Sequence, residues 1–178
     1  MKMLLNSLVI STLVCLSLSS CQNKQTIEEL AKYKELEAKK AANIEIVKQF
    51  YAHLDKFLNE EDYKAIINSW TPDSKRFGGS TDTSMSFEEM TPFLKMYYTS
   101  FPDLTHHITN IIAENDYVAV QLKFTGTQEA EFMGIAPNHK KIECKGVHIF
   151  KLTGGKVSEL HFLDDDLTMF TQLGQELK

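Results

Sequence analysis

The chain has 178 residues, of which 43% are hydrophobic and 24% are charged, and its formal net charge is −5. This length and composition are ordinary for one globular domain with a tail attached. A nucleic-acid-binding surface would need clustered Lys and Arg, so the negative balance argues against that class and we expect no nucleic-acid partner.

Residues 1–20 have the layout of an export signal, in which Lys2 precedes a mostly apolar stretch and small residues lead to Cys21. The stretch is shorter than the roughly 20 residues that a membrane-spanning helix needs. Leu18–Cys21 resembles the bacterial lipobox. This resemblance implies a lipid on Cys21 and a lipoprotein of the cell envelope, periplasmic or in the outer membrane. An uncleaved anchor and an ordinary secretory signal are the alternatives.

The cysteines are consistent with this interpretation. Cys15 lies in the signal and Cys21 takes the lipid, which leaves Cys144 alone in the domain. We therefore expect no internal disulfide, even in an oxidising compartment.

Residues 21–43 are rich in Ala, Glu, Lys and Leu, with Glu28/Lys32 and Glu35/Lys39 at i,i+4 spacing. This composition predicts a charged helical tether, either a solvated spacer or a helix that binds a partner. The folded domain is expected over residues 44–178, because from Ile46 onward apolar residues recur on one helical face.

Two more helices are expected at residues 59–70 and 86–101, the second one beginning with Ser86 and two glutamates. After Pro102 the apolar residues no longer recur at helical spacing but at every second position. Helices followed by strands indicate an α+β domain with a mostly antiparallel sheet. The predicted strands cover residues 104–112, 117–127, 140–152 and 156–164.

The last two strands meet at Gly154–Gly155. If this pair is a two-residue hairpin loop, paired positions place His148 opposite His161. The same register puts Asp165 on the histidine face, and it puts Asp164 and Asp166 on the other. The opposite face would then be an apolar core made by Val147, Ile149, Leu160 and Phe162.

His148, His161 and Asp165 are therefore the candidate catalytic residues. The histidines are open to three interpretations: imidazoles at a subunit interface, a ligand-pocket pair, or a transition-metal site. Zinc would need a third ligand that short spacing does not supply, so we expect no metal and no cofactor. The candidate ligand-binding residues are Cys144, Phe150, Glu159, Leu163, His107 and Trp70.

The first two predicted strands, residues 104–112 and 117–127, also form a hairpin, and its turn is predicted at Glu114–Asn115. This register places His106 on a polar face and His107 at the end of an apolar one. Adjacent strand residues point to opposite faces, so the two histidines cannot bind one ion together.

Four stretches in consistent order resemble the SnoaL-like polyketide cyclase and ester cyclase group of the nuclear transport factor 2-like superfamily. They are "IVKQFYAHLD", "FPDLTHHITNIIAENDYVAV", "FTGTQEAEFMGIAPNHKKI" and "GVHIFKLTGGKVSELHFLDDDLTMFTQLG". The resemblance implies a cone-shaped α+β domain, with N-terminal helices packed on a strongly curved, mostly antiparallel sheet around a pocket. It also implies a homodimer that pairs through the sheet.

Relatives of this kind often end their last strand with Glu-x-Trp-x-x-x-Asp. Glu159, His161 and Asp165 occupy these places, and His148 resembles the position of an oxyanion-stabilising acid. The chain departs from the resemblance at Phe77 and Phe162, where polar residues are common.

The resemblance implies a small hydrophobic ligand that contains a carbonyl group. The corresponding activity is that of a cyclase, isomerase or lyase working by proton transfer. The alternatives are an envelope lipoprotein that binds such a molecule without turnover, and one with a structural role only.

Overall fold

The computed structural model describes residues 2–78 and 83–176, with side chains from Lys24 onward. The chain divides into two compact units, Met1–Lys39 and Lys40–Lys178. The first unit consists of the helix α1 (Lys2–Leu54) as far as Lys39. The predicted signal peptide and the side chain of Cys21 lie outside the residues whose side chains are described. In the part of the chain that the structure describes, no helix is long and apolar enough to cross a membrane.

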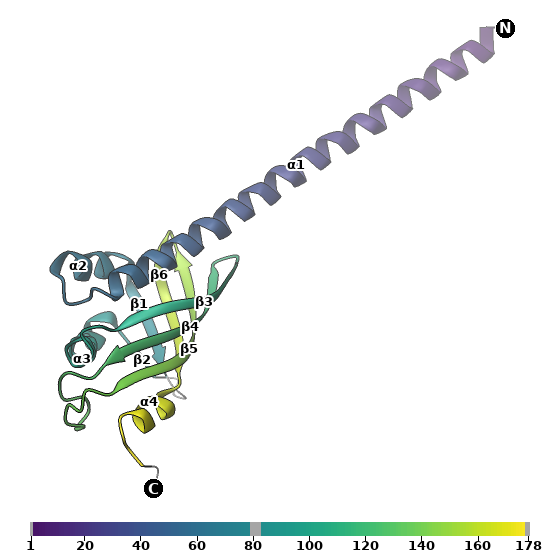
Figure 1. Cartoon of the computed structure of the whole chain (residues 1–178). Helices are drawn as coiled ribbons and strands as arrows, with labels where there is room; N and C mark the ends of the chain where they lie inside the picture. Colours follow the sequence, from purple (N-terminus) through teal and green to yellow (C-terminus); the bar gives the residue numbers. More distant parts are fainter. Residues whose placement is uncertain (1, 79–82, 177–178) are drawn as a thin grey trace. The chain divides into compact units, whose positions relative to one another are not determined.

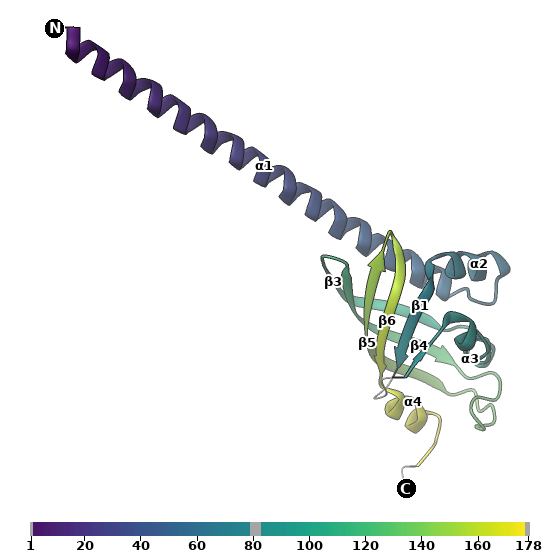
Figure 2. The same cartoon turned by 180° about the vertical axis from the view of Figure 1, so that it is seen from behind.

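The second unit contains, among the described residues, one six-stranded sheet with the order β2-β1-β6-β5-β4-β3. Strands β1 and β6 are parallel, and every other pair is antiparallel. Figures 1 and 2 show the sheet strongly curved, with α2 and α3 on one side of it. The strands are β1 (Trp70–Gly78), β2 (Ser84–Met85), β3 (Thr105–Glu114), β4 (Tyr117–Thr127), β5 (Lys141–Thr153) and β6 (Lys156–Asp164). This is the predicted α+β domain.

The helices of the second unit begin and end at sequence signals. Asn59 caps α2 (Glu60–Asn68) by accepting hydrogen bonds from two backbone amides of its first turn. Ser86 and Glu89 form a capping box at the start of α3 (Phe87–Ser100). The short helix α4 (Asp166–Gln172) follows β6 directly.

The core lies between the helices and one face of the sheet. Buried residues of β5 recur with a strict period of two, as expected for a strand that has one face in the interior. Helix α1 contributes a stripe at helical spacing. Its buried members are Val47, Phe50, Tyr51 and Leu54.

The predicted register of the β5–β6 hairpin is wrong beyond its first two pairs. Thr153 does pair with Lys156 across the Gly154–Gly155 turn, but the register then shifts by one residue at Ser158. Such a β-bulge exchanges the two faces of all later residues. His148 consequently lies opposite Phe162, and His161 lies opposite Ile149 on the outer face.

The same kind of error affects the β3–β4 hairpin. Its turn is one residue later than predicted, because Glu114 pairs with Tyr117, and a second bulge lies at Thr109 between the paired Ile108 and Asn110. The later turn leaves the predicted faces unchanged, but the bulge at Thr109 inverts them at the start of β3. His106 therefore points inward and His107 points to solvent, the reverse of the prediction.

The predicted helix over residues 59–70 ends earlier than expected. Helix α2 stops at Asn68, and Trp70 begins β1, which is not among the predicted strands. The strand pairs in parallel with β6, so Arg76 opposes Leu160 and Phe77 opposes His161. This strand carries Arg76 into the interior of the domain.

Candidate functional site

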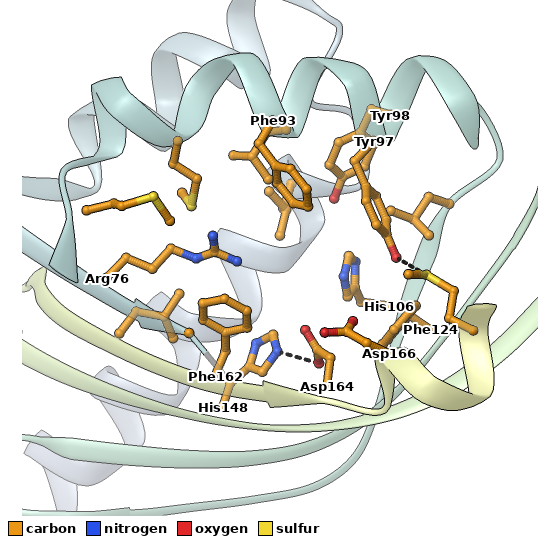
Figure 3. A pocket seen from close by; sticks show the side chains of 18 of the residues that line it. Arg76, Phe93, Tyr97, Tyr98, His106, Phe124, His148, Phe162, Asp164 and Asp166 are labelled. Carbon is orange, nitrogen blue, oxygen red and sulfur yellow. Dashed lines mark hydrogen bonds and ion pairs between the residues drawn. The ribbon is translucent and has the colours of Figure 1, made fainter. Parts of the chain in front are cut away.

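A cavity of about 490 Å³ opens between α3, α4 and the concave face of the sheet. Its walls are mostly apolar, and several titratable side chains point into it from β1, β3, β5 and β6 (Figure 3). This combination of an apolar pocket and a few convergent polar groups is typical of a small-molecule site. The titratable residues that line it are Arg76, Tyr97, Tyr98, His106, His148, Asp164 and Asp166.

Two of these side chains, His148 and Asp164, form a hydrogen-bonded chain with Tyr51, which does not itself line the cavity. The Tyr51 hydroxyl lies 2.7 Å from His148 Nδ1, and His148 Nε2 lies 3.1 Å from Asp164 Oδ1. A carboxylate can only accept, so Nε2 carries the proton and Nδ1 accepts from Tyr51. The network thereby fixes both the tautomer and the orientation of the imidazole.

Burial keeps His148 and Tyr51 in defined protonation states. It lowers the pKa of His148, an effect that the hydrogen bond to Asp164 partly opposes. Burial also raises the pKa of Tyr51 well above its ordinary value. At neutral pH the imidazole is therefore neutral and the phenol protonated, as the inferred hydrogen-bond directions require.

A second imidazole reaches the cavity from β3. His106 Nδ1 lies 2.6 Å from Asp55 Oδ1, and this carboxylate also accepts from the His106 backbone amide. Because Nδ1 donates to Asp55, Nε2 is the ring nitrogen left for a ligand. Asp55 belongs to the turn after α1, so this pair joins two distant parts of the chain.

The charged groups of the cavity are two carboxylates and one guanidinium. Burial and the neighbouring Asp164 raise the pKa of Asp166, which lines the cavity and remains exposed at its open side. The guanidinium carbon of Arg76 lies 3.7 Å from the centre of the Phe162 ring. Phe162 can approach this closely because its β1 partner is Gly78, where a methyl group would come within 2.0 Å of the ring.

Of the three predicted catalytic residues, only His148 lines the cavity. His161 lies on the outer face of the sheet, half exposed and stacked on Phe77 with ring centres 4.4 Å apart. Asp165 caps α4 by accepting from the Thr168 amide, and these hydrogen bonds lower the pKa of its carboxyl. The prediction that the three share a face is wrong, because the bulge at Ser158 exchanges the faces.

The six predicted ligand-binding residues lie around the cavity rather than in its wall. Phe150 and Trp70 belong to the core, where both pack against Phe50. Cys144 is buried beneath α4, and burial raises the pKa of its thiol to about 12. The other three, Glu159, Leu163 and His107, face solvent or the outer side of the sheet.

Five residues of this region were not predicted as site residues: Tyr51, Asp55, Arg76, Asp164 and Asp166. A signal was present for Arg76, since a polar group was sought near Phe77 and the adjacent residue supplies it. No comparable signal marks Tyr51, which falls in an apolar helical stripe. Among the described residues, no three His, Cys, Asp or Glu side chains lie close enough together to hold a metal ion.

Comparison with known proteins identifies the class to which this fold and site belong. The sequence profile of the SnoaL-like polyketide cyclase family matches residues 47–173, and the chain belongs to that family. None of the curated proteins compared with the chain matches it.

Solved structures with a similar fold include a candidate hydroxylase and candidate polyketide cyclases. AclR, a candidate hydroxylase from Streptomyces galilaeus, is 27% identical with a TM-score of 0.64, over 73% of this chain and 96% of that one. A candidate SnoaL-like polyketide cyclase from Jannaschia sp. CCS1 is 23% identical with a TM-score of 0.69, over 78% and 95%. IdmH, a candidate polyketide cyclase from Streptomyces antibioticus, is 23% identical with a TM-score of 0.63, over 75% and 99%. The last two similarities concern the fold alone.

Proposed function

We propose that the protein is an enzyme that moves a proton at a carbon next to a carbonyl group, in a small and largely hydrophobic molecule, as a cyclase or isomerase does. The observation that carries this proposal is the hydrogen-bonded chain from Tyr51 through His148 to Asp164, of which His148 and Asp164 line a largely apolar cavity. Membership of the SnoaL-like family supports it.

Asp164 is the general base in this proposal. Its carboxylate takes the proton from the carbon, and the pair of electrons moves to the carbonyl oxygen to give an enolate. His148 and Tyr51 hold the carboxylate in place, and a positioned base contributes about 10² to 10⁴-fold to such a step. The protonated Asp164 then returns its proton to the product.

Hydrogen–deuterium exchange tests the proposal without knowledge of the natural substrate. The probe is 2-tetralone in D₂O, and NMR follows the loss of the protons next to its carbonyl. We expect the protein to accelerate exchange and Asp164→Asn to reduce that acceleration at least about 100-fold.

Asp165→Asn is the matched control, because it neutralises the adjacent carboxylate outside the cavity while Asn still caps a helix. Tetralone binding without acceleration would identify a non-catalytic binding protein instead. Equal effects of the two substitutions would contradict the role of Asp164.

We further propose that the protein is a lipoprotein of the cell envelope held at a membrane through Cys21. The support is the sequence Leu18–Cys21 after a short apolar stretch. Acyl chains on this cysteine would contribute roughly 0.8 kcal/mol per buried methylene. Fractionation of a Gram-negative host that expresses Cys21→Ser tests this proposal. A variant that stays in the membrane pellet as fully as the parent would refute it.

A further inference from the structure

The cavity contains two hydrogen-bond donors that no described residue satisfies. Arg76 has no side-chain hydrogen bond or ion pair to any described residue, and its guanidinium stacks on the Phe162 ring. The Tyr98 hydroxyl is buried and has no hydrogen-bond partner among the described residues. Buried donors normally have acceptors, so both groups require an explanation.

The two donors enter the cavity from different elements, Arg76 from β1 and Tyr98 from α3. Each one contributes to the electrostatic environment of the other. Figure 3 shows the guanidinium reaching in from β1 and the Tyr98 hydroxyl on the cavity side of α3. Burial raises the pKa of Tyr98 well above its ordinary value, so its hydroxyl remains a donor. It also lowers the pKa of Arg76 to about 10, which still leaves the guanidinium charged at neutral pH.

The charged groups that face Arg76 do not satisfy its donors. Asp164 and Asp166 stabilise the cation at longer range, but neither forms an ion pair with it. Asp164 instead holds His148, and Asp166 lies at the open side. A guanidinium presents five N–H donors in a planar fork that suits two oxygen atoms of one ligand group.

We propose that Arg76 and Tyr98 bind an anionic oxygen group, so that the ligand of this cavity is a hydrophobic ring compound that carries a carboxylate or an enolate oxygen. The inference deepens the proposed function, since it rests on the same cavity and names the chemical class of its substrate. The aromatic and aliphatic walls bind the ring system, and Arg76 and Tyr98 bind the oxygen atoms. Phe162 holds the guanidinium in position by stacking on it.

The test compares two ligands that differ only in charge, anthraquinone-2-carboxylate and anthraquinone-2-carboxamide, by equilibrium dialysis at pH 7.5. We expect the carboxylate to bind at least about tenfold more tightly than the amide, as expected for charge-assisted hydrogen bonds. Arg76→Met should remove this preference while amide binding stays within twofold. Arg76→Lys should keep part of it, because an ammonium retains the charge but not the fork.

Two further variants separate the site from general effects. Lys75→Met removes an exposed cation from the adjacent position, and it should leave both affinities unchanged. Tyr98→Phe removes only the unpartnered hydroxyl, so it should weaken carboxylate binding several-fold without loss of stability.

Three results would overturn the inference: equal affinity for both compounds in the parent protein, an equal loss of both in Arg76→Met, or the same loss in Lys75→Met. Amide binding without a preference for the carboxylate would leave the pocket and the proposed proton transfer intact. If neither compound binds, both the anion site and the proposed small-molecule cavity fail.

Discussion

Gly146 lies directly opposite Asp164 in the pairing of β5 with β6, and a methyl group at Gly146 would come within 2.1 Å of Asp164 Oδ1. The same methyl group would lie 3.5 Å from His148 Nε2. Because Gly146 has no side chain, the Asp164 carboxylate can extend over this position of β5 and reach the His148 imidazole. A single backbone position controls the geometry of the proposed base.

Gly146→Ala should displace the Asp164 carboxylate and break its hydrogen bond to His148. We expect a loss of about 1–3 kcal/mol in the free energy of unfolding, because a charge-assisted hydrogen bond is lost and a buried imidazole is left without its acceptor. Urea denaturation measures this loss. In the Asp164→Ala background, Gly146→Ala should lower the free energy of unfolding only slightly. An equally large loss in that background would show that the added methyl group clashes with the backbone and not with Asp164.

His148 makes the stability depend on pH in a defined direction. Its pKa is lowered in the folded state, mainly by burial, while the unfolded value is about 6.5. Below that value the unfolded chain binds a proton that the native imidazole does not, so stability falls as the pH drops. The contribution is fully present above about pH 6.5 and is lost progressively below it, toward the folded pKa.

The measurement is urea unfolding at pH 7.5 and pH 5.5. His148→Gln should lose less stability between these two pH values than the parent protein. His139→Gln is the control, because the His139 imidazole lies at the surface. If the two variants show the same pH dependence, His148 is not the group responsible.

The helices α1, α2 and α3 and the strands β3 to β6 could be predicted from the sequence because periodicity and capping residues are local signals, whereas β1, β2 and α4 were not predicted. Ser86 begins a helix by capping it, and the Gly154–Gly155 turn starts the last hairpin where expected. The curved sheet followed from the family resemblance.

The composition of the site could not be predicted, because it depends on two β-bulges. Ser158 and Thr109 have no sequence feature that marks them as extra residues. Each is held by a hydroxyl hydrogen bond to the partner strand, a contact that exists only in the folded sheet. One unpaired residue exchanges the faces of the strand beyond it. Asp164 and His106 therefore face the interior, where Asp165 and His107 had been predicted.

Asp55 should control the tautomer of His106. In the parent protein we expect the neutral ring to carry its proton on Nδ1, which donates to the Asp55 carboxylate and leaves Nε2 for a ligand. Asp55→Asn replaces this acceptor by an amide and should weaken the bias. Imidazole ¹⁵N chemical shifts report the tautomer directly. His107 is an internal control on the opposite face, and an unchanged His106 signal in the variant would contradict the pairing.

The outer face of the sheet is the surface through which we propose that two copies pair. Val147, Ile149 and Leu163 lie together on β5 and β6, and each exposes more than 40% of its surface. A contiguous exposed apolar patch of this kind marks an interaction site. The resemblance to the nuclear transport factor 2-like superfamily makes a second copy the expected partner.

Light scattering coupled to gel filtration tests this pairing. We expect a dimer at tens of micromolar, and Leu163→Glu should raise its dissociation constant at least tenfold. The reason is that burying a leucine contributes about 1.5–3 kcal/mol, whereas a buried unpaired carboxylate opposes association. Leu58→Glu is the matched control, since Leu58 is similarly exposed but lies in the turn after α1. A monomeric parent protein would contradict the pairing. Equal weakening by both substitutions would show that the dimer forms through another surface.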